Sequence, residues 1–104
     1  MAESAVLCAA AEVPEGQIRL EMLPDGTQLA LYNVGGRIYA TANFCTHGEA
    51  SLADEGTLHG NIVECGWHFG RFDVTTGEPC ALPCTVPLRT YPVTMIEGMV
   101  HVEF

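Results

Sequence analysis

The chain has 104 residues, the length of one small domain, and 48% of them are apolar, which is enough for a core without disulfide support. Thirteen acidic side chains stand against four arginines and no lysine, so the net charge is −9. This charge excludes a nucleic-acid binder, because phosphates are neutralised by basic side chains, and it disfavours an anionic membrane surface. A chain of this charge could bind a basic partner protein, which electrostatic attraction would bring to it from a distance. The acidity could also serve only to keep a small protein soluble.

The first residues predict neither export nor membrane insertion. Residues 1–4 have no basic side chain, and the apolar stretch 5–11 is too short to cross a bilayer and contains Cys8. Five cysteines are an odd number, which is awkward for a disulfide framework and fits a reducing compartment. We therefore expect a cytoplasmic protein in which Cys8 packs as a small apolar side chain.

Short strands separated by turns are predicted along the chain, with almost no helical periodicity. Apolar and polar side chains alternate at 18–22, a Pro-Asp-Gly turn follows, and Gly35-Gly36 joins a strand at 29–34 to one at 38–41 as a tight hairpin. Further strands are predicted at 62–64, 71–74, 91–96 and 99–104. Only residues 52–56 could form a helical turn, since eleven glycines and six prolines argue against long helices. The sequence therefore predicts one all-β domain, an antiparallel sandwich or barrel.

Two motifs each combine one cysteine with one histidine. One residue separates Cys45 from His47, two separate Cys65 from His68, and 17 residues lie between the motifs. Both motifs fall at predicted hairpin tips, so two neighbouring loops could hold one metal site. Two thiolates and two imidazoles suit a single Zn²⁺, and they also suit a [2Fe-2S] cluster with cysteines on one iron and histidines on the other. Mixed Cys–His pairs at this spacing are less typical of zinc, but the residues alone leave both centres open.

Short segments around the two motifs form a longer pattern. They read CTHG at 45–48, SL at 51–52, EG at 55–56, IVEC at 62–65, GRFDV at 70–74, TG at 76–77, PCTVPL at 83–88 and YPV at 91–93. In this pattern the chain resembles the Rieske-type ferredoxins of bacterial multicomponent aromatic-ring dioxygenases, over nearly its whole length. The resemblance implies a single Rieske domain over 1–104, with a small cluster-binding subdomain at about 43–74 formed by two hairpin loops.

By this resemblance the cofactor is one [2Fe-2S] cluster. Cys45 and Cys65 would hold the buried iron, and His47 and His68 the outer iron. Two thiolates leave the oxidised centre neutral, and a neutral centre accepts an electron more readily than the negative centre made by four cysteines. High-potential Rieske proteins join their two cluster loops by a disulfide. Ala50 and Trp67 stand at the matching positions here, so that disulfide cannot form and a low potential is expected.

The resemblance further implies an electron carrier and not an enzyme. The chain would take one electron at a time from an NAD(P)H-dependent reductase and deliver it to the terminal oxygenase of an aromatic-ring dioxygenase, acting as a monomer. Three alternatives stay open. They are a ferredoxin of a di-iron aromatic monooxygenase, a small Rieske-like subunit of a reductase complex such as nitrite reductase, and a structural zinc module.

Three residues beside the predicted ligands could shield the cluster or contact a partner. Trp67, between two ligands, could present an aromatic face to a redox partner, or it could pack against the cluster loops. Pro83 resembles part of the family's third loop, and Leu82 precedes it; shielding there would keep water from the centre.

The remaining cysteines and histidines are interpreted as non-ligands. Cys80 and Cys84 could form a redox disulfide or add ligands, but four ligands are complete without them, so we interpret both as structural. His59 and His101 have no cysteine nearby in the sequence. No nucleophile with an adjacent base is apparent, so we predict no catalytic site.

Overall fold

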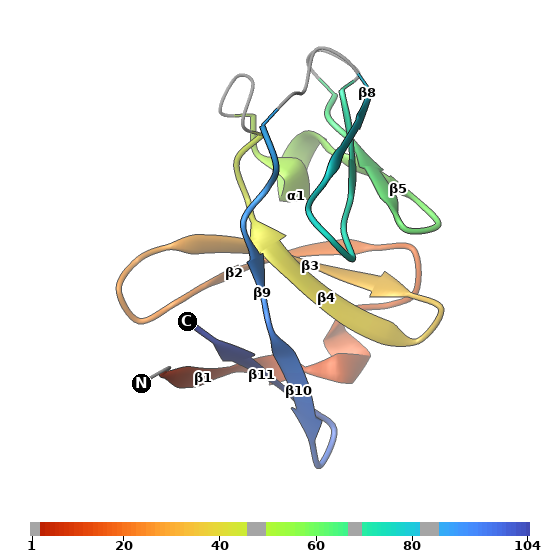
Figure 1. The fold of residues 1–104 in the computed structure, drawn as a ribbon. Helices are drawn as coiled ribbons and strands as arrows, with labels where there is room; N and C mark the ends of the chain where they lie inside the picture. The colour runs from red at the N-terminus through yellow and green to blue at the C-terminus, as the bar shows by residue number, and fades with distance from the viewer. Residues whose placement is uncertain (1–2, 46–49, 67–69, 82–85) are drawn as a thin grey trace.

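The computed structural model describes residues 3–45, 50–66, 70–81 and 86–104. Its strands form three antiparallel sheets that are stacked in layers (Figure 1). The two termini pair with each other through backbone hydrogen bonds between Glu3 and Phe104 of 3.0 and 2.8 Å, in the layer drawn lowest. The prediction of an antiparallel all-β fold is confirmed.

The middle layer, here called the central sheet, contains the strands predicted at 18–22, 29–34 and 38–41. It consists of β2 (Ile18–Met22), β3 (Gln28–Val34), β4 (Arg37–Ala42) and β9 (Thr90–Tyr91), in that order. Gly35 and Gly36 have φ of 61° and 92°, which is the two-residue hairpin turn that glycine favours. The three predicted strands of this hairpin region are confirmed to within one residue at each end.

The terminal sheet brings together the two ends of the chain. It consists of β1 (Ser4–Ala9), β11 (Met99–Glu103) and β10 (Val93–Ile96), in that order. The sequence analysis did not predict β1, because residues 5–9 are continuously apolar and show no alternation. The short 3-10 helix η1 (Ala10–Glu12) then leads to the central sheet.

The third layer, the loop-bearing sheet, carries the segments around the second motif. It consists of β5 (Thr57–His59), β6 (Ile62–Glu64), β7 (Arg71–Asp73) and β8 (Pro79–Ala81), in that order. The predicted helical turn is present as α1 (Leu52–Glu55), and Ser51 Oγ accepts the Asp54 N–H at its start, at 3.3 Å. Nowhere in the described ranges is a helix long and apolar enough to cross a membrane. The sheet continues past residue 74, the end of the predicted subdomain, to β8.

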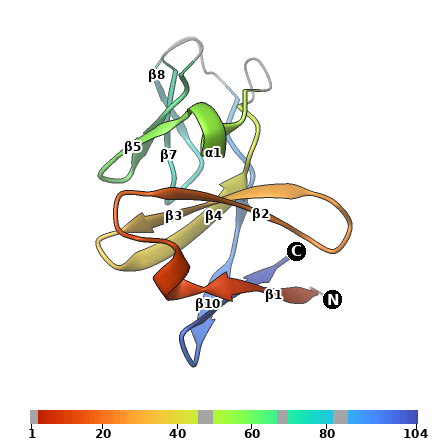
Figure 2. The same ribbon diagram turned by 180° about the vertical axis from the view of Figure 1, so that it is seen from behind.

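Strand β3 separates two hydrophobic cores. Ala30 and Tyr32 point into the first core, between the central and loop-bearing sheets, whereas Leu29 and Leu31 point into the second core, toward the terminal sheet. All four side chains are 0% exposed. Figure 2 shows the same arrangement from behind, with the central sheet covered on both faces. The first core therefore supports the end of the molecule where the two motifs lie.

Candidate metal centre

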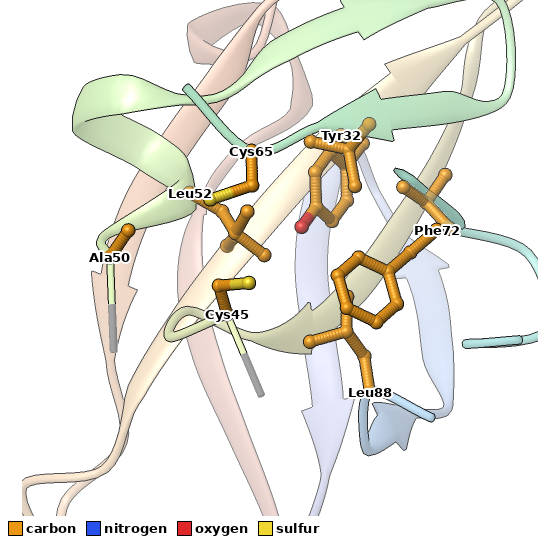
Figure 3. Packing of buried hydrophobic residues seen from close by; sticks show 10 residues of the cluster. Tyr32, Cys45, Ala50, Leu52, Cys65, Phe72 and Leu88 are labelled. Atoms are coloured by element: carbon orange, nitrogen blue, oxygen red, sulfur yellow. The ribbon is translucent and has the colours of Figure 1, made fainter. Parts of the chain in front are cut away.

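The fold brings the cysteines of the two predicted motifs into one cluster of buried side chains. Cys45 comes after β4 and is 2% exposed, and Cys65 comes directly after β6 and is 1% exposed. Both belong to the first core, and Figure 3 shows them grouped with Leu52 and Ala50. Two segments that lie far apart in the sequence thus present two buried thiols to the same place.

The two motif loops are closed in the same way. The N–H of Cys45 donates to the carbonyl of Ala50 at 2.9 Å, and the N–H of Cys65 donates to the carbonyl of Gly70 at 2.8 Å. In each loop the bond joins the cysteine to the residue five positions later. Each cysteine is therefore the first residue of a loop of equal length, held at its base by the backbone.

Asn43 reinforces the base of the first loop. Its side chain is 0% exposed, and its Nδ2 donates to Ser51 Oγ at 2.9 Å and to Gln28 Oε1 at 3.3 Å. Its Oδ1 accepts the N–H of Ala53 at 2.9 Å, and its carbonyl accepts the N–H of Leu52 at 2.7 Å. The amide therefore ties β3 to both sides of the loop. Asn43 was not among the residues predicted for the site; its signal in the sequence is a polar residue close to the first motif, with Ser51 eight positions later.

The second loop extends from a regular β-ladder. Glu64 pairs with Arg71 across β6 and β7, and their side chains form an ion pair with 2.9 Å between Nε and Oε2. Arg71 is mostly exposed, so this pair contributes at most about 1 kcal/mol. Arg71 therefore contacts the acidic surface beside the second loop.

Gly66 brings the second loop against α1. A Cβ built at Gly66 would overlap the carbonyl oxygen of Glu55, the last residue of α1. Only glycine therefore fits here without displacing one of the two backbones. This contact joins the two loops, since α1 follows the first loop and Gly66 follows Cys65.

Apolar side chains without solvent exposure pack around the two thiols. Phe72 and Leu52 are 0% exposed, and Figure 3 shows them with Tyr32 around the cysteines. The Tyr32 hydroxyl makes a 2.8 Å hydrogen bond with Thr41 Oγ1, and burial raises the pKa of Tyr32, which keeps the phenol protonated. Such surroundings lower the local dielectric around a metal centre.

The two clustered thiols fit a metal centre with soft ligands. Two buried thiols from separate loops are what a Zn²⁺ site or one iron of a [2Fe-2S] cluster requires. Within the described ranges no three His, Cys, Asp or Glu side chains are grouped so that they could hold a metal ion, and the two thiols are the donors that these ranges contribute. The other predicted site residues lie outside the described residues: His47, Trp67, His68, Leu82 and Pro83.

Cys8, Cys80, His59 and His101 are not part of the hydrophobic cluster that contains Cys45 and Cys65. Cys8 is 6% exposed in the second core, as predicted, and burial raises the pKa of its thiol. Cys80 is exposed on β8, which does not fit a packed structural role, and Cys84 lies outside the described residues. His59 lies on β5 and His101 on β11, and neither joins a group of metal donors within the described ranges.

Comparisons with known proteins agree with this arrangement. The Rieske [2Fe-2S] domain family matches residues 3–92. The ferredoxin component of the p-cumate 2,3-dioxygenase system of Pseudomonas putida is 53% identical over 97 residues, which cover 93% of this chain and 82% of that protein. The structure of the Sphingomonas yanoikuyae B1 ferredoxin is 41% identical with a TM-score of 0.92, and the match covers 98% of this chain and 99% of that one.

A second similar structure contains a partner protein. It is the complex of reduced oxygenase and oxidised ferredoxin in carbazole 1,9a-dioxygenase. The matched chain is 46% identical with a TM-score of 0.89, and the match covers 95% of this chain and 91% of that one. The similarity therefore extends over nearly the whole length of both proteins.

Proposed function

The chain belongs to the Rieske [2Fe-2S] domain family, and from this we propose that it is the low-potential ferredoxin component of an aromatic-ring dioxygenase system. It carries one electron at a time from an NAD(P)H-dependent reductase to a terminal oxygenase, and it is an electron carrier and not an enzyme. The observation that carries the proposal is the burial of Cys45 and Cys65 in two loops closed alike. The 53% identity to a dioxygenase ferredoxin component supports the same role.

Cys45 and Cys65 hold one iron, and His47 and His68 hold the other. When bound, the [2Fe-2S] cluster supplies one-electron redox chemistry. The chain's own residues then have two tasks. The apolar first core keeps water from the thiolates, and the loop-closing hydrogen bonds hold the two cysteine backbones in place. Ala50 is buried beside Cys45 and offers no thiol for a disulfide between the loops, which is consistent with a low potential.

The partners are the reductase and the terminal oxygenase, with no nucleic acid and no membrane. The solved complex of a 46% identical ferredoxin with the carbazole 1,9a-dioxygenase oxygenase supports the second partner. Trp67, Leu82 and Pro83 shield the cluster or contact these partners. We further propose that the chain is one Rieske domain over 1–104, with its cluster-binding subdomain at about 43–74, and that it works as a monomer in the cytoplasm.

Metal content and cysteine substitution test the ligand set. The purified protein is expected to be coloured and to contain iron and acid-labile sulfide in equal amounts, about two of each per chain. Cys45→Ser and Cys65→Ser should each abolish the visible absorption. Cys80→Ser is the matched control, because Cys80 is exposed on β8, and it should keep the wild-type spectrum.

Two results would contradict the proposal. A colourless protein with one zinc per chain would identify a structural zinc module. Full iron content in Cys45→Ser or Cys65→Ser would show that other side chains hold the metal.

A further inference from the structure

We infer that Asn43 is a positioning residue for the metal centre, acting together with α1 to set where Cys45 lies relative to Cys65. The inference rests on the proposed function, because it concerns how the chain places the two thiolate ligands. Asn43 itself is two positions from Cys45 and acts through the backbone and through α1.

The first step links Asn43 to Cys45. The Asn43 carbonyl accepts the N–H of Leu52, and the Cys45 N–H donates to Ala50, so the two residues form consecutive rungs of one short ladder. The bridge between Phe44 and Ser51 lies between these rungs. A displacement of Asn43 would therefore move the residue that carries the first thiol.

The second step links Asn43 to α1. Ser51 Oγ accepts from Asn43 Nδ2 at 2.9 Å and from the N–H of Asp54 at 3.3 Å, so one hydroxyl joins the buried amide to the start of the helix. The Ala53 N–H donates to Asn43 Oδ1 at 2.9 Å, which satisfies a second backbone group of the first turn. The position of α1 therefore depends on the Asn43 side chain.

The third step links α1 to the second cysteine. Glu55, at the end of α1, lies against Gly66, and Gly66 is bonded to Cys65. Leu52, the buried residue of α1, packs in the first core with both cysteines. A continuous path of hydrogen bonds and close packing thus runs from Asn43 through the four-residue helix to Cys65.

Loss of the Asn43 hydrogen bonds would be costly because this side chain is 0% exposed. If the amide were removed, the partly buried Ala53 N–H would lose its partner, and the Ser51 hydroxyl would keep only its bond with the Asp54 N–H. The loop base and α1 would then shift to recover hydrogen bonds, and the distance between the two thiols would become less well defined.

Iron release tests this inference, measured as the rate at which an excess of a ferrous-iron chelator removes iron from the reduced protein. We expect Asn43→Ala to lose iron at least about tenfold faster than the wild type, since residues that orient metal ligands typically change metal affinity by this factor or more. Ser51→Ala removes one of the Asn43 side-chain bonds together with the bond from the Asp54 N–H, and it should give a smaller increase because the Asn43–Ala53 bond remains. This variant also tests the inference if Asn43→Ala does not fold. Ser51→Thr keeps the hydroxyl and should release iron at the wild-type rate.

Asn33→Ala is the matched control for a loss of stability alone. Asn33 also makes side-chain bonds to the backbone, donating to the Val13 carbonyl at 2.7 Å and accepting the Gly36 N–H at 2.9 Å, but it lies at the opposite end of β3 from Gln28. Asn33→Ala should lower the denaturation midpoint and leave both the iron-release rate and the electron paramagnetic resonance spectrum of the reduced protein unchanged. In Asn43→Ala that spectrum should broaden or shift.

Two outcomes would overturn the inference. One is a wild-type iron-release rate and spectrum in folded Asn43→Ala or, where that variant does not fold, in Ser51→Ala. The other is an equal acceleration in Asn33→Ala, which would trace the effect to global stability. A wild-type protein that binds no iron would instead refute the proposed function, so the two failures are distinguishable.

Discussion

Glu97 has a φ of 51°, the left-handed region that favours glycine and asparagine. It forms the turn between β10 and β11 together with Gly98, whose φ is 79°. Glu97→Asn should therefore raise the free energy of unfolding by about 0.5–1 kcal/mol, because asparagine tolerates this conformation with less strain. Chemical denaturation of the purified protein measures the change.

Glu15→Asn serves as the control for the Glu97 substitution. Glu15 is also an exposed glutamate, but its φ is not positive. The same substitution there should leave the denaturation midpoint nearly unchanged. An equal gain at both positions would point to the loss of negative charge and not to backbone strain.

At the scale of single residues, a candidate ligand motif is easier to recognise in the sequence than the side chains that support it. Cys45 and Cys65 stand out because a ligand motif is local in sequence. Asn43 does not, because its bonds reach Gln28 and Ala53, which are 15 and 10 positions away and are near only after folding. For Gly66 the sequence indicates only loop flexibility. The structure gives a different reason for this glycine, since its φ is not positive and the close approach of Glu55 excludes a side chain.

At the scale of elements, the contact between α1 and the second loop leads to a further prediction. Gly66→Ala would force a Cβ into the Glu55 carbonyl, so the loop and the helix would have to separate. We expect the free energy of unfolding to fall by about 1–3 kcal/mol, as overpacking usually does. We also expect the purified variant to contain less iron, because the displaced residue is bonded to Cys65.

Gly60→Ala separates this effect from ordinary backbone strain. Gly60 has a φ of 61°, and a Cβ added to it would meet no heavy atom within 4 Å, so only conformational strain is added. That variant should lose about 1 kcal/mol of stability and keep its full iron content. A normal iron content in Gly66→Ala would contradict the role of this contact.

The elements that sequence analysis missed share one physical property, the lack of a recognisable local period. Residues 5–9 of β1 are all apolar and show no alternation in the sequence, and the partner strand β11 lies at the other end of the chain. β5 and β8 have three residues each, too few for a period of two to be recognised. The longer strands and the helical turn at 52–56 could be predicted because their turns carry glycine or proline and their alternation continues over several residues.

At the scale of the whole molecule, the charge seen by a partner is negative. All four arginines of the chain interact with other side chains of the same chain. Arg19 and Arg71 form ion pairs with glutamates at 2.6–3.0 Å, and Arg37 and Arg89 lie over tyrosine rings at 5.5 and 4.8 Å. The net charge of −9 is therefore presented mainly by carboxylates, and a basic docking surface on each redox partner would be attracted to it.

Electron transfer between this protein and its partners should depend on salt. Raising the ionic strength shortens the Debye length to about 3 Å at 1 M, so the second-order rate of electron transfer to the oxygenase should fall at least roughly tenfold from low to high salt. Stopped-flow measurements of ferredoxin reoxidation give this rate. Reoxidation by an uncharged quinone is the control and should not change. A salt-independent rate with the oxygenase would rule out electrostatic steering.

The central position of β3 has a consequence for how this protein can vary. Its consecutive side chains serve opposite cores, so inserting or deleting one residue would send Leu29 and Leu31 toward the cysteines and Tyr32 toward the terminal sheet. Both cores would fail together, although only one strand had changed. Length variation between homologous chains is therefore expected at the hairpin tips, such as the turn at 24–26, and not within β3.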